Sequence, residues 1–500
     1  MTSDIVRIHC RSSEGDTFDK VLVGIAYKKQ LHNFTGARNP HKMNLNVLLV
    51  GFDSISRMTA IRKYVKTRDY ILNKLNGIEL EGYNIVGDGT PQALIPILTG
   101  TTEIELPESR RGFKNARHVD GHPFIWKDYK KDGYITHFVE DLPPISIFNH
   151  RMVGFNHQPT DHYGRPYYLA SESRVELYFP FCYKGSKKHN IFLKMFEDFF
   201  DMYPNKMKFG FGFHSEISHD DNNRIELFDE DVYLWLKSLE DKGHLNNTML
   251  IFMSDHGARF SQFRATSQGK LEERMPFFTF TFPKWFEKVY PDAMQNFRIN
   301  SKRLVTPFDI HATMYHMINY DGTGIGDVNN RGISLFREIP KHRTCAHAFV
   351  EPHWCACLDW QVVEANSPLL KRAIFVSISS INKWIQTASN QCHFLRISKI
   401  TRSKQYHANS RMLKFKKSAD NHGRIADLSS KTTYDETFYQ ITFITEPGSG
   451  LFEVTVRHNL KSNEMTIGLS DVSRTNAYGD DPKCIKDTLP HLERFCKCKT

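Results

Sequence analysis

The chain has 500 residues, of which 40% are hydrophobic and 13% aromatic, and this composition excludes a largely disordered protein. Lysine and arginine (66) outnumber aspartate and glutamate (56), giving a net charge of +10 without any dense basic run. The charge therefore favours a polyanion, an acidic headgroup or a phosphate-bearing substrate as partner, and no nucleic acid is expected. The length predicts one large and one small domain.

From about residue 44, short apolar runs alternate with amphipathic stretches. Strands are expected at 46–53, 78–86, 207–213 and 248–255, and helices at 56–75, 91–100 and 224–243. Strands separated by helices of this length predict a mostly parallel sheet that is covered by helices on both faces. In such sheets, ligands bind beyond the carboxyl ends of the strands.

The pattern changes after about residue 365, where apolar and polar residues alternate between turn signals such as EPGSG at 446–450. This alternation predicts antiparallel strands at 372–378, 393–400, 438–445 and 451–458. We therefore expect an N-terminal extension (1–43), an α/β domain (44–365) and a C-terminal β-rich, cysteine-containing domain (366–500).

The nine cysteines include no C-x-x-C pair, which disfavours a zinc ribbon. Their clustering in the second half predicts disulfides rather than a zinc site at His353, Cys355 and Cys357, and disulfides imply the secretory lumen or the extracellular space. The odd count leaves one thiol free or paired with a segment absent from this chain. Sequons at Asn33 and Asn246 agree with that route.

No apolar run approaches the roughly 18 residues of a membrane helix, and the start MTSDIVRIHC is not a signal peptide. We therefore expect that any targeting or membrane-anchoring segment is absent from this chain.

Three short segments carry the chemistry. Asp53 ends a predicted strand, Thr90 follows a Gly-Asp-Gly turn at a predicted helix start, and Asp255 and His256 follow another strand. Two carboxylates, an imidazole and a hydroxyl suit zinc, manganese or magnesium. A metal contacting the Thr90 hydroxyl would make it a nucleophile and would neutralise a phosphoryl oxygen.

Each of these residues also has an ordinary structural explanation. Asp53 could cap the helix that follows it, Thr90 could be an N-cap before Pro91, and Asp255–His256 could form a surface turn. His219 and Asp220 could belong to a solvated turn and Arg57 could face solvent. Arg274, in turn, could pair with a carboxylate of the site.

Together the motifs carry a resemblance. FDSISR (52–57), Thr90 ten residues before the glycine of LTG, SDHG (254–257), ERMPFF (273–278), TPFDIHATM (306–314) and RGISLF (331–336) occur in this order. The chain thereby resembles the alkaline phosphatase-like superfamily. With HWCACLDW (353–360) and the cysteine-rich tail, it resembles one animal branch, described by a domain of unknown function, number 229. The resemblance implies an α/β, alkaline phosphatase-like sandwich with a mostly parallel central sheet flanked by helices, plus a smaller C-terminal antiparallel β-rich region.

The nucleophile position separates the branches of this superfamily. A sulfatase needs Cys or Ser there, to form formylglycine, and an arginine four residues later; this chain has Thr90 and Leu94. Threonine resembles the pyrophosphatase, lipoteichoic acid synthase and phosphoethanolamine transferase branches. The resemblance implies a metal-dependent phosphodiesterase or a phosphoryl-group transferase of the phosphoethanolamine or phosphoglycerol type. The alternatives are a sulfuric ester hydrolase without formylglycine and an inactive member that binds a glycan or headgroup.

The resemblance also implies the ligands. We expect one ion, zinc or manganese, bound by Asp53, Thr90, Asp255 and His256. His219 is expected near the substrate, as the acid that protonates the leaving group. A second ion could use His219 and Asp220, and further candidates for the second metal or the substrate are His214 and Arg57. The expected partner is an anionic ester, glycan- or lipid-linked, in a pocket lined by loops within 103–175.

Overall fold

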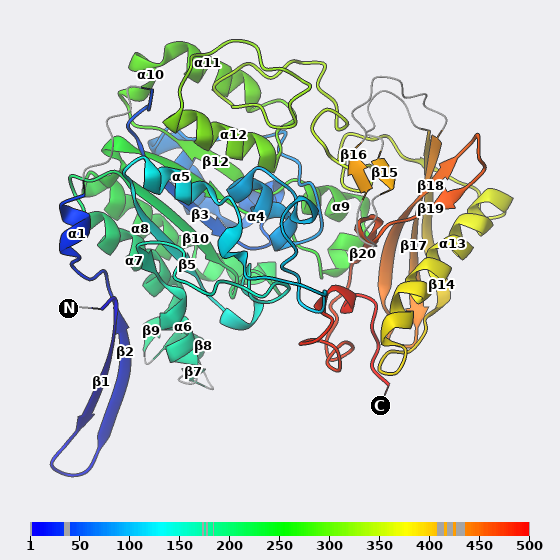
Figure 1. The fold of residues 1–500 in the computed structure, drawn as a ribbon, viewed down its shortest axis with the longest axis horizontal. Coiled ribbons are helices and arrows are strands. Elements are labelled where there is room, and N and C mark those ends of the chain that lie inside the picture. The colour runs from blue at the N-terminus through cyan, green and yellow to red at the C-terminus, as the bar shows by residue number, and fades with distance from the viewer. Residues whose placement is uncertain are drawn as a thin grey trace.

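The computed structural model describes residues 3–34, 41–172, 175–176, 179–183, 185–407, 415–417, 424–426 and 436–499. A large α/β part and a smaller C-terminal sheet with its own helix lie side by side, and an N-terminal hairpin of β1 (Ile5–Arg11) and β2 (Thr17–Val23) projects from the large part (Figure 1). None of the helices in these residues has the length and apolarity to cross a membrane.

The large part is built on a seven-stranded sheet with the order β4-β12-β11-β3-β10-β5-β6. Its strands are β3 (Asn46–Phe52), β4 (Ile78–Glu79), β5 (Ile135–Glu140), β6 (His162–Tyr163), β10 (Lys208–His214), β11 (Thr248–Met253) and β12 (Phe278–Thr281). The run from β11 to β6 is parallel, and β12 is antiparallel to both of its neighbours. The predicted mostly parallel sheet is therefore confirmed.

The strand predicted at 78–86 is wrong beyond Glu79. There the backbone amides of Glu81 and Asn84 donate to the carbonyls of Ser301 and Val305, which lie in an irregular segment. The apolar residues after Glu79 are buried, but they belong to a loop that leads to the Thr90 turn.

Helices cover both faces of this sheet. On one face, Leu49 of β3 and Phe211 of β10 pack in one core with α4 (Thr90–Thr99), α5 (Ile125–Lys131), α11 (Pro291–Asn300) and α12 (Pro307–Ile318). On the other face, Val50 packs with α2 (Arg57–Lys63), α7 (Lys188–Met202) and α8 (Asp229–Asp241). Because successive strand residues point to opposite faces and helices cover both, the central strands are buried along their whole length and are mostly apolar.

The helix predicted at 56–75 is divided into α2, α3 (Val65–Asp69) and a π-helical turn (Tyr70–Lys74). The hydroxyl of Ser56 caps α2 by accepting from the Thr59 amide. Asp53 is therefore not the cap of this helix and its carboxylate is free for other contacts.

The C-terminal part is a six-stranded antiparallel sheet of β13 (Gln361–Val362), β14 (Arg396–His407), β17 (Glu436–Glu446), β18 (Leu451–Asn459), β19 (Met465–Thr466) and β20 (Val472–Arg474). The predicted strand at 372–378 is wrong, because this segment lies inside helix α13 (Pro368–Ile385). Ser367 caps the helix, and Leu370, Ala373 and Ile381 are buried along one side. The 3.6-residue period over the whole helix outweighs the local alternation.

A buried ionic cluster joins the two parts. Glu453 of β18 lies 2.9 Å from Arg274, the last residue of helix α9 (Ser267–Arg274), and 3.2 Å from Arg264, which precedes that helix. Both arginines also contact Glu273. Burial would raise the pKa of Glu453, but Lys270 and the two arginines hold it well below its usual range. Arg274 is therefore part of this cluster and does not pair with a carboxylate of the candidate site.

Three disulfides confirm the prediction of disulfides in the second half: Cys345–Cys355, Cys392–Cys496 and Cys484–Cys498. Cys355 is thus part of a disulfide, and His353 forms hydrogen bonds with the hydroxyls of Thr455 and Ser473. His353, Cys355 and Cys357 therefore do not form a zinc site. Three cysteines rather than one stand outside disulfides: Cys10, Cys182 and Cys357.

Candidate functional site

Parallel pairing of β3 and β11 brings the acidic residues of the site together. Gly51 pairs with Met253, so Asp53 and Asp255, each two residues further on, emerge level at the same edge of the sheet. Asp53, Asp255 and His256 are at most 2% exposed, and one ligand atom from each lies within 4.8 Å of the others.

Backbone groups orient these three side chains. Asp255 Oδ1 accepts from the amides of Ser54 (3.1 Å) and His256 (2.8 Å). His256 Nδ1 lies 2.9 Å from the carbonyl of Gly257, which can only accept, so Nδ1 carries the proton and Nε2 presents a lone pair. Nε2 lies 3.1 Å from Asp255 Oδ2 and 3.8 Å from Asp53 Oδ1.

The geometry fits a divalent cation. Asp255 Oδ2 and His256 Nε2 are buried and have no hydrogen-bond partner among the residues that the structure describes, which is costly for polar atoms. Burial, and then the nearby Asp53, raises the pKa of Asp255. An ion held by both carboxylates and Nε2 would satisfy the orphaned atoms and offset the repulsion between the carboxylates.

Thr90 lies beside this group. It is the first residue of α4, whose N-cap is Gly89 with φ 86° and ψ −179°. Its hydroxyl donates to Asp53 Oδ2 across 3.5 Å. The free amides at this helix start favour an anion in front of the hydroxyl.

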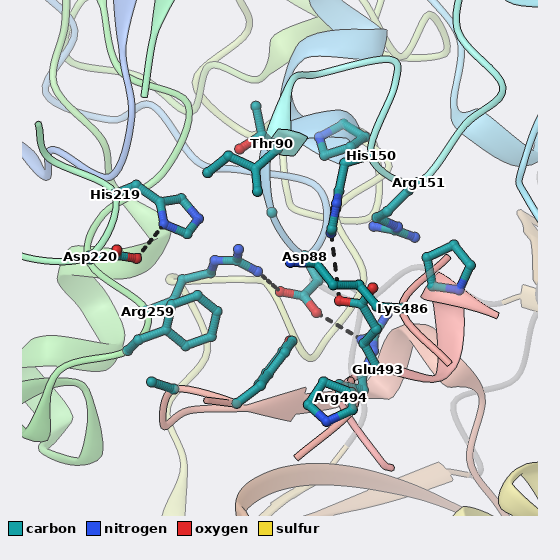
Figure 2. A pocket seen from close by; sticks show the side chains of 18 of the residues that line it. Asp88, Thr90, His150, Arg151, His219, Asp220, Arg259, Lys486, Glu493 and Arg494 are labelled. Carbon is teal, nitrogen blue, oxygen red and sulfur yellow. Dashed lines mark hydrogen bonds and ion pairs between the residues drawn. The ribbon is translucent and has the colours of Figure 1, made fainter. Parts of the chain in front are cut away.

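A cavity of about 610 Å³ opens in front of Thr90 and Asp53, and it is also lined by His219 and Asp220. His219 Nδ1 lies 2.7 Å from Asp220 Oδ1, and the imidazole faces into the cavity (Figure 2). Burial lowers the pKa of His219, but the carboxylates of Asp53 and Asp220 outweigh it, so the pKa is raised. His219 can therefore hold a proton close to the metal-binding group.

Two sequence-predicted residues lie outside this cavity. His214 is fully buried behind it, 3.3 Å from Asp141 and packed against the rings of Phe52 and Phe192, and burial holds its pKa well below the ordinary value. Arg57 donates to Glu79 across 2.9 Å instead of contacting the site.

The sequence did not reveal three charged residues at the site. Asp88 lies between two guanidinium groups, 2.9 Å from Arg259 and 2.8 Å from Arg494 (Figure 2). Burial would raise the pKa of Asp88, but Arg494 and Arg259 hold it far below its usual range. Proximity to GDGT and SDHG could have indicated Asp88 and Arg259. Arg494 is 406 residues from its partner, and no local pattern indicates that contact.

The wall of the cavity also differs from the expectation. Within 103–175, lining residues come only from 145–147 and 150–151, while eleven come from the C-terminal part. We call these eleven residues the C-terminal wall: Ala477, Tyr478, Gly479, Asp480, Pro482, Lys483, Lys486, Pro490, His491, Glu493 and Arg494. In the sequence, the basic residues near the last cysteines were the signal that could have indicated the C-terminal wall.

The structure thus defines an α/β protein in which a buried Asp–Asp–His group and a threonine at a helix start face one cavity. The chain belongs to the family described as "Protein of unknown function (DUF229)", whose model matches residues 1–401. No curated protein sequence matches the chain.

Several solved structures are similar to this one. The lipoteichoic acid synthase LtaP from Listeria monocytogenes is 12% identical with a TM-score of 0.39, covering 61% of this chain and 80% of its own. An alkaline phosphatase superfamily protein from Vibrio parahaemolyticus is 9% identical with a TM-score of 0.41, covering 93% and 92%. Murine ectonucleotide pyrophosphatase/phosphodiesterase 5 is 13% identical with a TM-score of 0.37, covering 55% and 95%.

Proposed function

We propose that this protein is a metal-dependent phosphodiesterase or phosphoryl-group transferase with Thr90 as the nucleophile. The observation that carries the proposal is the pair of orphaned buried atoms, Asp255 Oδ2 and His256 Nε2, in a group whose third member, Asp53, accepts the Thr90 hydroxyl. A hydroxyl beside a metal-binding group, at a helix start that favours anions, suits attack on an anionic ester.

The metal-binding residues are Asp53, Asp255, His256 and Thr90, and zinc or manganese fits this mixture of oxygen and nitrogen donors. When bound, the ion supplies positive charge that lowers the pKa of the threonine hydroxyl and neutralises a phosphoryl oxygen. One ion is favoured, because among the described residues Asp53, Asp255 and His256 form the sole cysteine-free group with ligand spacing. A second ion at His219 and Asp220 is the alternative.

The side chains then divide the steps between them. Asp53 Oδ2 accepts the proton of Thr90, whose oxygen forms a bond to phosphorus while the amides of α4 orient the phosphoryl oxygens. The bond from phosphorus to the leaving oxygen breaks, and His219 protonates that oxygen. His219 then takes a proton from the acceptor, whose oxygen displaces Thr90, and Asp53 returns the first proton. Water as acceptor makes a hydrolase, and a sugar hydroxyl makes a transferase.

Sulfuric esters are the second candidate substrate. A sulfate ester, with one negative charge, requires less positive charge than a phosphate dianion, so a single ion is compatible with sulfate chemistry as well. Threonine cannot become formylglycine, and position 94 is a fully buried leucine in place of a supporting arginine, so any sulfate chemistry would use Thr90 directly. An inactive member that binds a glycan or headgroup is the third reading.

The three disulfides support an oxidising environment for this chemistry. We therefore place the activity in the secretory lumen or the extracellular space, on an ester carried by a glycan or a lipid.

The test combines metal content by mass spectrometry with hydrolysis of bis-p-nitrophenyl phosphate and p-nitrophenyl sulfate. We expect about one zinc or manganese per chain in wild type and Thr90→Ala, and none in Asp255→Asn. Both variants should lose cleavage of the phosphodiester. Asp241→Asn, on the exposed surface of α8, is the matched control and should behave as wild type.

Faster cleavage of the sulfate ester than of the phosphodiester would favour the second candidate. A wild-type protein that binds no metal and cleaves neither ester would refute the enzyme and leave the binding reading.

A further inference from the structure

The cavity is much larger than the reacting group. Its volume of about 610 Å³ falls within the range of pockets that enclose whole small-molecule ligands, roughly 300–1,000 Å³. A phosphoryl group at Thr90 fills only a small part of it. The remainder of the substrate must therefore contact the rest of the lining, of which the C-terminal wall supplies eleven of 25 residues.

Covalent bonds hold this wall in place. Cys484–Cys498 and Cys392–Cys496 fasten it to itself and to the segment that follows α13. Arg494 fastens it to the turn before Thr90 through Asp88. The wall is thus a fixed surface that can recognise a ligand without first becoming ordered.

Two ammonium groups of the C-terminal wall are not neutralised by any side chain that the structure describes. Lys483 and Lys486 line the cavity and are exposed, and within the described part of the chain neither side chain has a hydrogen bond or ion pair. Lys486 lies across the cavity from His219 (Figure 2). Their charge is therefore available to a ligand.

The carboxylates of the cavity do not cancel this charge. Asp53 belongs to the metal-binding group, Asp220 pairs with His219, and Glu493 lies 3.6 Å from His150. Asp88 is shared by two guanidinium groups, so that trio keeps one net positive charge. Asp480, exposed on the same wall, and Glu493, whose contact with His150 is an ion pair only when the imidazole is protonated, oppose the two lysines. Together with the trio around Asp88, these groups still keep one net positive charge.

We propose that the substrate of this site carries a second anionic group, separate from the reacting ester, and that Lys483 and Lys486 bind it. This inference rests on the proposed function and specifies its substrate class: an anionic ester whose remainder bears a sulfate, phosphate or carboxylate. Because an ammonium group is a point charge without the fixed fork of a guanidinium, the pair accepts any of these anions.

The experiment compares two phosphodiesters that differ in one charge: phenyl p-nitrophenyl phosphate and p-sulfophenyl p-nitrophenyl phosphate. With wild type, we expect the sulfonate to lower KM about tenfold, as two partly exposed charge contacts allow. In the double variant Lys483→Gln/Lys486→Gln this advantage disappears, because KM rises much more for the sulfonate than for the phenyl diester, whose only charge is the phosphodiester itself. The advantage also decreases as sodium chloride is raised, since exposed charges are screened.

The matched control is Lys371→Gln/Lys383→Gln, two exposed lysines on α13 outside the cavity, which should keep the full preference. Charge reversal, Lys483→Glu/Lys486→Glu, should make the sulfonate unfavourable. Equal KM values for the two diesters in wild type, or a preference that survives Lys483→Gln/Lys486→Gln, would overturn the inference while the proposed function stands.

A binding measurement separates the two proposals. Titration of both diesters into Thr90→Ala, which retains the wall, gives dissociation constants that do not depend on turnover. Tighter binding of the sulfonate that requires the two lysines supports the anion subsite even where wild type cleaves neither diester, an outcome that would refute the proposed function alone. Equal dissociation constants would refute the subsite.

Discussion

Gly89→Ala tests whether the turn before Thr90 determines the position of the nucleophile. Gly89 has φ 86° and ψ −179°, a region that is essentially restricted to glycine and costs other residues roughly 1–3 kcal/mol. An added Cβ would also lie 2.9 Å from Arg259 Nη1, and Arg259 is held in place by Asp88. The turn must therefore either store this strain or move.

Both responses have measurable consequences. If the turn holds, the free energy of unfolding decreases by about 1–3 kcal/mol. If it moves, Thr90 moves with it, and a shift of about 1 Å lowers turnover on the order of 100-fold. We expect a lower denaturation midpoint, a loss of kcat of this order on bis-p-nitrophenyl phosphate, or a share of both. Metal content should stay at the wild-type level, because three of the four proposed ligands, Asp53, Asp255 and His256, are not displaced.

Gly121→Ala is the matched control, because no heavy atom lies within 4 Å of the added Cβ and no positive φ is required there. It should leave both stability and turnover unchanged. Wild-type stability and wild-type kcat in Gly89→Ala would refute the reasoning, since Thr90 would then be positioned by something other than this turn.

Two further predictions concern contacts of the C-terminal part. Arg494→Gln removes one of the two cations that hold Asp88, so kcat should decrease about tenfold with unchanged metal content; an unchanged kcat would show that Arg259 alone positions the turn. Glu453→Gln leaves the buried Arg264 and Arg274 of the ionic cluster with Glu273 as their shared carboxylate and should lower the free energy of unfolding by about 3–5 kcal/mol in denaturant titrations. Glu446→Gln, an exposed partner of Arg396, should change it little, and equal effects of the two changes would contradict the importance of burial.

The parts of the structure that the sequence predicted depend on short-range patterns. Strand β11 is a mostly apolar run that the polar pair Asp255–His256 follows closely, and the parallel sheet then brings Asp53 and Asp255 to one edge. The parallel register of the two strands places these side chains together, because neighbouring strands that run in the same direction end at the same side of the sheet.

The errors have two physical origins. The segment 372–378 alternates like a strand, but its side chains follow a helical period that is visible only over the whole of Pro368–Ile385. A window of seven residues cannot separate the two periods. The contact between Asp88 and Arg494 spans 406 residues, and such a pairing depends on the folded arrangement of both parts.

Two separate stretches of chain supply the reacting groups of the cavity and much of its remaining lining. The groups proposed for bond making and breaking come from the sheet edge and α4, whereas much of the surface beyond them belongs to residues 477–494, which the disulfides of Cys484, Cys496 and Cys498 hold in place. Reactivity and selectivity can therefore be altered separately. Exchanging residues 477–491 within the same disulfide frame, with Arg494 retained, would redirect the protein to a different ester while the chemical step stays the same.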